Sequence, residues 1–347
     1  MGRKILWGSL ALTPVTLAAH YGFHLGLVAQ FVLAAASLVP LAWLIGESTE
    51  HAAEYTGPGI GGFLNASFGN APELIIALFA IADGLPNVVR GSLSGSVIGN
   101  LLLVLGFALV LGPARIDKPS LVSQLGLVAL AVALFLIPSG LAFGGSRDRH
   151  PLALVTIPLA CLLLLAYVGE RIVGLRRHHA KHAASESQLS AGAWSFTLAV
   201  GVLGLATVAT AFVSEILVHS LDAFGHAVGL SQFFVSAIIV AIVGNAAEHG
   251  GAVVIARRGK LKLASEIAVT SSAQVALFVA PAVALLSFAI RPALPLAFRW
   301  EELVGMAAAA LAVFVVVWDG RGKRWEGIAL VGLYAGVAIW FSLAPAR

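Results

Sequence analysis

The chain has 347 residues, of which 59% are hydrophobic and only 11% are charged. Soluble domains carry about 25% charged residues, so this composition excludes an ordinary soluble protein and indicates a membrane protein. The net charge of +4 comes from basic residues in short connections between apolar segments. Basic residues in such places are topology signals, so we expect no nucleic-acid partner. The single cysteine, Cys161, excludes a disulfide or a cysteine-ligated metal site within one chain.

Apolar runs long enough to cross a membrane recur along nearly the whole chain. A spanning helix needs about 20 mainly apolar residues, whereas a barrel strand needs about 10 of alternating polarity. The run lengths therefore predict an all-α polytopic membrane protein with about eleven transmembrane helices. In chain order, the predicted helices cover residues 5–22, 25–46, 58–84, 91–113, 121–142, 150–170, 194–220, 230–256, 265–289, 300–318 and 325–343.

Basic residues are distributed unequally between the two sides of this arrangement. The side that carries the N-terminus has fifteen Lys and Arg residues, and the other side has six. Cytoplasmic loops are enriched in positive charge. We therefore predict an integral protein of a bacterial inner (plasma) membrane, with the N-terminus in the cytoplasm and the C-terminus outside.

The longest polar connection, GERIVGLRRHHAKHAASESQLSAG at 169–192, divides the chain. Its histidines suit metal binding or pH sensing, but a solvated basic cytoplasmic loop is the preferred interpretation because charge-rich connectors usually set topology. The predicted organisation is an N-terminal transmembrane helix at 1–23, a first five-helix repeat at 24–171, a basic, histidine-containing cytoplasmic loop at 172–192 and a second five-helix repeat at 193–347.

Two segments of the chain resemble each other at a constant offset of 175 residues. They are FGNAPELIIALFAI, which begins at residue 68, and VGNAAEHGGAVVIA, which begins at residue 243. An odd number of helices in each repeat inverts the second copy, and inverted repeats bring two half-sites together near the membrane midplane. The shared residues are Gly69 with Gly244, Asn70 with Asn245, and Glu73 with Glu248.

Both motifs place oxygen atoms on apolar helices. An asparagine and a glutamate three residues apart share a helix face, so an amide oxygen and a carboxylate approach the same ion. The neighbouring glycines allow close backbone approach or local unwinding. The helix after each motif begins with small polar residues that add further oxygens. The predicted metal-ion site consists of Glu73, Glu248, Asn70, Asn245, Ser96, Ser271 and Gln274.

Oxygen ligands without thiolates favour a hard cation, and calcium takes about 6–8 of them. Two carboxylates match a divalent charge. When the cation leaves, the two acids repel each other in a medium of low dielectric constant and gain affinity for protons. We therefore predict that Glu73 and Glu248 also couple proton movement to cation movement, by competition and alternating access.

Several neighbouring residues are secondary candidates. One buried acid could merely pair with a nearby histidine or arginine, but two acids at equivalent positions favour a functional role. His249 either adjusts the proton affinity of Glu248 or bonds to a nearby carbonyl. The remaining candidates are Asn100, Gly69 and Gly244.

At these residues the sequence resembles the calcium/cation antiporter superfamily, and more closely its calcium/proton exchanger branch. The resemblance implies one N-terminal helix followed by two inverted five-helix repeats that exchange cytosolic calcium for external protons. It also implies that Glu73 and Glu248 bind the ion and the proton, and that the amide and hydroxyl residues of the predicted site contribute oxygens. The motifs that carry it are GGFLNASFGNAPELI at 61–75, SEILVHSLD at 214–222, IIVAIVGNAAEH at 238–249 and IAVTSSAQVALFVAP at 267–281.

Two features depart from this family pattern. Many relatives carry an acidic central stretch, whereas this loop is basic, and Pro72 resembles the sodium/calcium branch. The alternatives are therefore a Na⁺(K⁺)/H⁺ antiporter and, less favoured, a Na⁺/Ca²⁺ exchanger. No nucleophile with a base and no H-E-x-x-H motif is present, so we expect no enzyme and no cofactor. The expected partners are membrane lipid and transported inorganic cations. The sequence is also compatible with a homo-oligomer.

Overall fold

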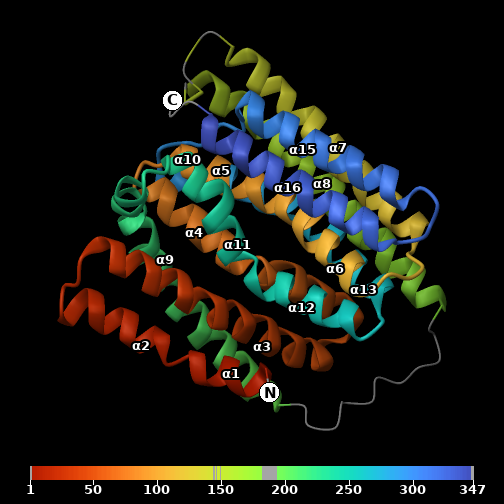
Figure 1. Ribbon diagram of the computed structural model, residues 1–347, viewed down its shortest axis with the longest axis horizontal. Coiled ribbons are helices and arrows are strands. Elements are labelled where there is room, and N and C mark those ends of the chain that lie inside the picture. Colours follow the sequence, from red (N-terminus) through yellow and green to blue (C-terminus); the bar gives the residue numbers. More distant parts are fainter. Residues whose placement is uncertain (1, 144, 146, 149, 182–193, 345–347) are drawn as a thin grey trace.

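The computed structural model describes residues 2–143, 145, 147–148, 150–181 and 194–344, and the named elements in these residues are all helices (Figure 1). The predicted all-α polytopic fold class is confirmed. The helices of the first half are α1 (Gly2–Ser9), α2 (Leu12–Leu17), η1 (Ala18–Gly22), α3 (Leu27–Gly69), α4 (Ala71–Ala82), α5 (Pro86–Ile98), η2 (Gly99–Val104), α6 (Leu105–Leu111), α7 (Lys118–Leu141) and α8 (His150–Lys181).

The second half contains the same kind of structure, in which short π-helices, labelled η, interrupt longer α-helices. The first ten residues of the predicted loop at 172–192 continue helix α8, and residues 182–193 lie outside the described part of the chain. The helices of the second half are α9 (Phe196–Val228), α10 (Gln232–Phe234), η3 (Val235–Val240), α11 (Ala241–Gly244), α12 (Ala246–Arg257), α13 (Leu261–Gln274), η4 (Val275–Val279), α14 (Ala280–Ile290), α15 (Trp300–Val317) and α16 (Arg324–Leu343).

The predicted spans and the observed helices agree except at 5–22, 58–84 and 230–256, which the structure divides. Among the described residues, eight helical stretches are long and apolar enough to cross a membrane, and the pair 232–244 and 246–257 forms a ninth, bent by 59°. The predicted helix at 5–22 is divided into α1, α2 and η1. The predicted helix at 58–84 is formed by the end of α3 together with α4.

Helix α3 is assigned as one helix of 43 residues, where the sequence predicts two helices. A straight helix of this length would extend about 64 Å, twice the thickness of the bilayer core. The chain reverses instead. This follows from Gly61, where a Cβ would lie only 3.0 Å from the Cβ of Ala53. Eight residues of straight helix would separate these two positions by about 12 Å. The predicted connection is therefore a tight helical turn, which returns Asn70 to the protein interior.

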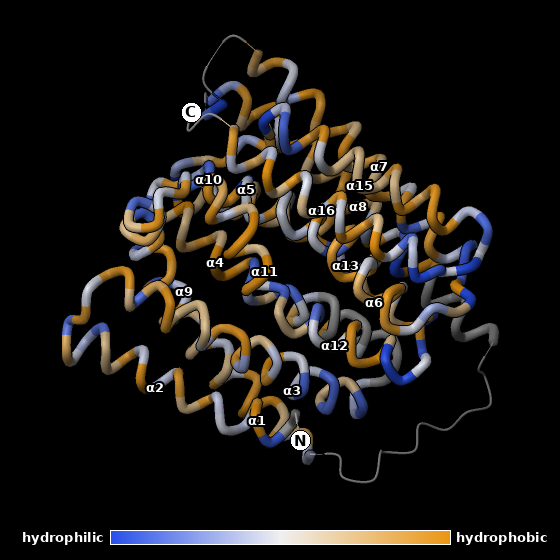
Figure 2. Tube along the Cα trace, viewed as in Figure 1, coloured by the Kyte–Doolittle hydropathy of each residue, from blue (hydrophilic) through white to orange (hydrophobic). Residues whose placement is uncertain are grey.

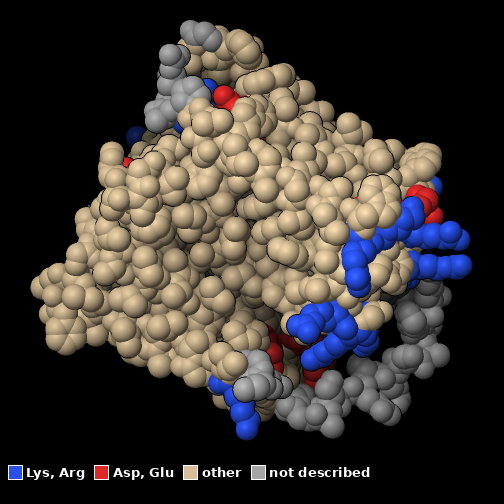
Figure 3. Space-filling model, viewed as in Figure 1, with Lys and Arg blue, Asp and Glu red and all other residues tan. Residues whose placement is uncertain are grey.

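The basic connections of the chain meet at one end of the bundle. The Ile116 amide donates to the Gly320 carbonyl at 3.2 Å, and Lys262 Nζ lies 2.7 Å from Asp117 Oδ2. Figure 3 shows Lys and Arg gathered at this end, where the connections α6–α7, α12–α13 and α15–α16 lie in Figure 1. The structure therefore groups these connections on one side, as the charge distribution predicted.

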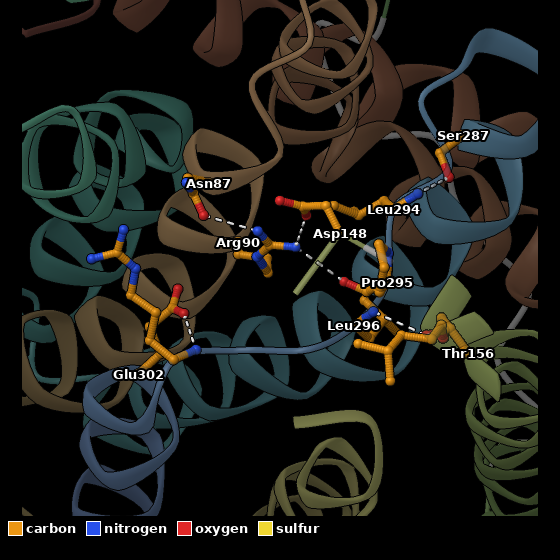
Figure 4. Close-up of polar contacts among 11 residues, drawn as sticks. Asn87, Arg90, Asp148, Thr156, Ser287, Leu294, Pro295, Leu296 and Glu302 are labelled. Atoms are coloured by element: carbon orange, nitrogen blue, oxygen red, sulfur yellow. Dashed lines mark hydrogen bonds and ion pairs between the residues drawn. The ribbon is translucent and has the colours of Figure 1, made fainter. Parts of the chain in front are cut away.

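At the opposite end, Arg90 of α5 joins three segments that are distant in the sequence (Figure 4). Its guanidinium group donates to Asp148 Oδ1 at 2.9 Å, to Asn87 Oδ1 at 2.8 Å and to the Pro295 carbonyl at 3.4 Å. Arg90 is only 1% exposed. A buried guanidinium without partners would be strongly destabilising, so these contacts hold the connections α7–α8 and α14–α15 against α5.

The stretch 86–111, which contains α5, η2 and α6, is the most enclosed of the spanning stretches. Figure 2 shows apolar residues along most helices and hydrophilic residues at the connections. Small residues let α5 lie directly against η3, because Gly91 faces Ser236 and Gly95 faces the main chain of Ala237. This contact positions the polar residues of α5 opposite the second acidic motif.

We predict that Gly95→Ala lowers the thermal stability of the purified protein. The new Cβ would overlap the Ala237 carbonyl oxygen, and relieving such overpacking costs about 1–3 kcal/mol. The matched control is Gly201→Ala on α9, where a Cβ meets nothing within 4 Å. Thermal unfolding in detergent measures both variants, and equal midpoints would contradict the close contact of α5 with η3.

Candidate cation-binding site

Both acidic motifs interrupt a helix at asparagine. Asn70 has φ −101° and ψ 16°, and Asn245 has φ −89° and ψ 9°, so neither continues the preceding helix. A new helix starts at the next residue, which places Glu73 in the first turn of α4 and Glu248 in the first turn of α12. Helix N-termini carry partial positive charge and free N–H groups. Each carboxylate therefore lies where a helix dipole favours negative charge.

The two motifs lie against each other in a reciprocal manner. A Cβ on Gly244 would lie 3.4 Å from Glu73 Oε1, and a Cβ on Gly69 would lie 3.5 Å from Glu248 Oε1. Each carboxylate thus packs beside the glycine of the other motif. The absence of a glycine side chain leaves room next to each carboxylate, on the side that faces the other half of the chain.

The amide side chains of both motifs bond to the helices that follow the other motif. Asn70 Nδ2 donates to Gln274 Oε1 of α13 at 3.0 Å. Asn245 Nδ2 donates to Ser96 Oγ of α5 at 2.7 Å and to the Ala241 carbonyl at 2.9 Å. Asn70, Asn245 and Ser96 are each 1% exposed. The predicted oxygen-bearing residues of four helices therefore come together in the interior.

Asn100 has a more central position than the sequence indicated. Its Nδ2 donates to Ser271 Oγ at 3.0 Å and to Asn245 Oδ1 at 3.3 Å, and its Oδ1 lies 3.0 Å from His249 Nε2. The Ser271 hydroxyl in turn donates to Glu248. His249 therefore contacts an amide oxygen, and one hydrogen-bonded network joins both halves of the chain.

A small cavity lies beside Glu73. Its volume is about 10 Å³, and its lining includes Glu73, Ser92 and Ser96 of α5, and Gly244. A water or an ion of similar size needs about that much space. Among the described residues, Glu73 Oε2 has no hydrogen-bond partner, although it is buried. An unsatisfied buried carboxylate oxygen beside a cavity is what a site for a cation or proton requires.

The two acids differ in accessibility. Glu73 is 8% exposed, whereas Glu248 and His249 are partly exposed. The structure therefore encloses the first acidic motif more tightly than the second.

The sequence interpretation missed Ser92 and gave Asn100 only a minor place. The offset of 175 pairs Ser96 with Ser271, but it pairs Ser92 with Ile267 and Asn100 with Val275. A search based on repeat equivalence could not have found these two positions. Both lie on α5 and η2 together with Ser96, and a helical face count from Ser96 at intervals of four residues would have included them.

The charged residues of the candidate site are few. In the part of the chain that the structure describes, no three His, Cys, Asp or Glu side chains group closely enough to hold a metal ion. The site instead combines two carboxylates with the amides and hydroxyls described above.

The fold and the paired motifs define a polytopic membrane protein with related halves. The sequence model of the sodium/calcium exchanger protein family matches residues 26–169 and again residues 198–343. The chain belongs to this family.

Comparison with individual proteins adds detail. The chain is 38% identical over 325 residues to the Ca(2+)/H(+) antiporter ChaA of Bacillus subtilis (strain 168), covering 90% of this chain and 92% of that protein. It is 33% identical over 364 residues to a Ca(2+)/H(+) antiporter of Aphanothece halophytica, covering 99% and 97%. The solved structure of native YfkE has a TM-score of 0.84 at 34% identity, covering 98% of this chain and 99% of that one.

We predict that Gly244→Ala weakens cation binding without unfolding the protein. The added methyl group would be in ordinary contact with Glu73 Oε1 and would occupy the space beside this carboxylate. Losing one ligand contact reduces affinity by about tenfold, equivalent to about 1.4 kcal/mol. Equilibrium binding of radioactive Ca²⁺ to the purified protein measures the effect.

The matched control for this variant is Gly251→Ala on the next helix, α12, where a Cβ meets nothing within 4 Å. Equal affinities in both variants would argue that the space between Gly244 and Glu73 has no part in cation binding.

Proposed function

We propose that the protein is a secondary antiporter that exports cytosolic Ca²⁺ in exchange for H⁺ at the site formed by Glu73 and Glu248. The observation that carries this proposal is the reciprocal approach of the two acidic motifs, each carboxylate beside the other motif's glycine. The names of the Bacillus subtilis and Aphanothece halophytica relatives, both Ca(2+)/H(+) antiporters, support it. The calcium/proton pair is thus favoured over the sodium and potassium alternatives.

The cation would be held by oxygens from both halves of the chain. Glu73 and Glu248 would supply charge, and the side-chain oxygens of Asn70, Asn245, Ser96, Ser271 and Gln274 would complete a ligand set of the size that calcium prefers. Asn100 would position Ser271 and Asn245 through its amide group. In the structure the amide and hydroxyl side chains bond to one another or to Glu248, so cation binding exchanges hydrogen bonds for ion contacts.

Proton coupling follows from the shared carboxylates. A carboxylate among apolar helices is unfavourable unless a cation, a proton or a hydrogen-bond donor neutralises it. Calcium and protons therefore occupy the two glutamates in turn. The empty site, with two negative charges, is the species least suited to move across the membrane, which prevents uncoupled leakage.

The proposed arrangement in the membrane uses two inverted five-helix repeats, at 24–171 and 193–347, after an N-terminal helix. The family match in each half and the equivalent helix breaks at Asn70 and Asn245 support this division. We place the end with the basic connections in the cytoplasm, following the positive-inside rule. The N-terminus is then cytoplasmic and the C-terminus external.

Ion flux in inverted membrane vesicles tests this function directly. With an imposed proton gradient, we expect Ca²⁺ addition to release protons, and Glu73→Gln and Glu248→Gln each to abolish the release. Glutamine keeps the volume of the side chain but removes its charge and its proton. Asp222→Asn on α9, a side chain that is 64% exposed, serves as the control and should exchange normally.

The same assay separates the alternatives. Sodium, potassium and magnesium are offered singly, so exchange that responds to sodium or potassium and ignores calcium would overturn the calcium proposal. Calcium uptake driven by a sodium gradient without proton movement would instead indicate a Na⁺/Ca²⁺ exchanger.

We further predict that Ca²⁺ binding weakens as the pH falls. Protons and calcium bind the same carboxylate oxygens, so each proton bound must leave before calcium binds. Dissociation constants measured on the purified protein at a series of pH values should increase toward acid pH. The slope should decrease in Glu73→Gln, which removes one of the two protonatable groups, and an affinity independent of pH would exclude direct competition.

A further inference from the structure

An apolar groove runs along the surface between α7 and α15, away from the candidate cation site. Its volume is about 450 Å³. Small side chains such as Gly126, Ala129 and Ala133 form one wall, and Ala307 and Phe314 lie on the other. The groove lies on two helices that are long and apolar enough to span the membrane. Its walls therefore face the hydrocarbon region.

A second, polar pocket of about 640 Å³ adjoins the groove at the end of the bundle that contains Arg90. Leu136 of α7 lines both cavities, so they are neighbours along this helix. Trp300, which is 60% exposed, also lines the polar pocket. Exposed tryptophans at helix ends mark the depth of the lipid headgroups. The polar pocket thus lies at headgroup level and the groove at the level of the acyl chains.

The charges of the polar pocket form a matched pair. Asp148 lines the pocket but is already paired with Arg90 (Figure 4). Arg147 and Glu301 line it as well, and both act electrostatically on the neighbouring Arg299. Among the described residues neither is within 4.0 Å of an opposite charge, so one cation and one anion remain for a ligand in the same pocket.

A further polar group in the pocket lacks a partner. The hydroxyl group of Ser139 on α7 has no hydrogen-bond partner in the described part of the chain, although Ser139 is only 8% exposed. A buried hydroxyl without a partner is unusual and is satisfied when a polar group enters the pocket.

We propose that the groove and the polar pocket together form a binding site for one zwitterionic aminophospholipid, such as phosphatidylethanolamine. Arg147 pairs with the phosphate and Glu301 with the primary ammonium group, since guanidinium groups suit phosphate and carboxylates accept hydrogen bonds from ammonium groups. One acyl chain fills the groove between α7 and α15. The site is separate from the proposed transport site and does not depend on the transported ion.

The dimensions of the groove agree with an acyl chain. Its lining residues on α7 extend from Val122 to Leu136, which is about 21 Å of helix. One leaflet contributes about 15 Å of hydrocarbon. The groove is therefore long enough for the whole chain of a lipid whose headgroup lies in the polar pocket.

The charge pair also predicts which lipids are disfavoured. Phosphatidylglycerol offers a phosphate to Arg147 but leaves Glu301 facing a headgroup without a cation. Phosphatidylcholine has a quaternary ammonium group, which cannot donate a hydrogen bond to Glu301. Only the primary ammonium headgroup satisfies both residues.

Native mass spectrometry of the full-length protein in detergent tests this site. Phosphatidylethanolamine, phosphatidylcholine and phosphatidylglycerol with identical acyl chains are added at equal concentrations, and the fraction of protein with bound lipid is measured. We expect phosphatidylethanolamine to be retained about tenfold more strongly, the ratio for one hydrogen bond to a charged group. Arg147→Gln and Glu301→Gln should each remove this preference.

Two further variants complete the test. Gly126→Leu places a side chain in the groove, where a Cβ meets nothing within 4 Å, and should reduce retention of all three lipids. Arg291→Gln changes an exposed arginine outside both cavities and should leave the preference intact. Equal retention of the three lipids, preference for phosphatidylglycerol, or an unchanged preference in both charge variants would overturn the proposal. So would a Gly126→Leu variant that dissociates an oligomer but retains lipid normally, because the groove would then be a contact between copies.

Discussion

The structure depends on one electrostatic constraint, which is the cost of placing Glu73 and Glu248 among apolar helices. A carboxylate in such surroundings is unfavourable unless hydrogen bonds, a proton or a cation compensate its charge. The chain meets part of this cost by ending a helix at Asn70 and at Asn245, so that each acid lies at the N-terminus of a new helix. Ser271 compensates Glu248 further by donating a hydrogen bond, whereas Glu73 retains an oxygen with no partner among the described residues. In the proposed function, the transported ions neutralise the charge that the protein leaves uncompensated.

Close approach of the helices is the second requirement, and small residues provide it. Gly69 and Gly244 leave space beside the carboxylates, and Gly95 brings α5 against η3, so that Ser96 reaches Asn245. Membrane helices associate through packing and hydrogen bonds because lipid and protein are equally apolar. The same small residues that hold the bundle together therefore shape the site. At the end of the bundle opposite the basic connections, Arg90 fixes the connections around the pocket that we propose for a lipid headgroup.

The helical fold class and the pairing of Glu73 with Glu248 were predictable from local sequence features. The length of the apolar runs indicated a polytopic helical protein, and the motif shared at 69–73 and 244–248 identified Glu73 and Glu248 as partners. Asn100 was harder to place, because its repeat equivalent is Val275 and its importance comes from contacts with Asn245, Ser271 and His249. The reversal of α3 near Gly61 was predicted as a connection between two helices, but not as a continuous helical turn.

The sequence by itself determined that the buried charges of Glu73 and Glu248 had to be compensated. Composition, hydropathy and the repeated motif can be read from single segments of the chain. The sequence also determined that two such segments, 175 residues apart, would carry the same chemistry. Only the tertiary structure decided which partner compensates which group. Asn70 bonds to Gln274, Asn245 bonds to Ser96, and each glutamate packs beside the other motif's glycine, across more than 140 residues of chain. These contacts depend on how helices distant in the sequence cross, and no local pattern specifies that geometry.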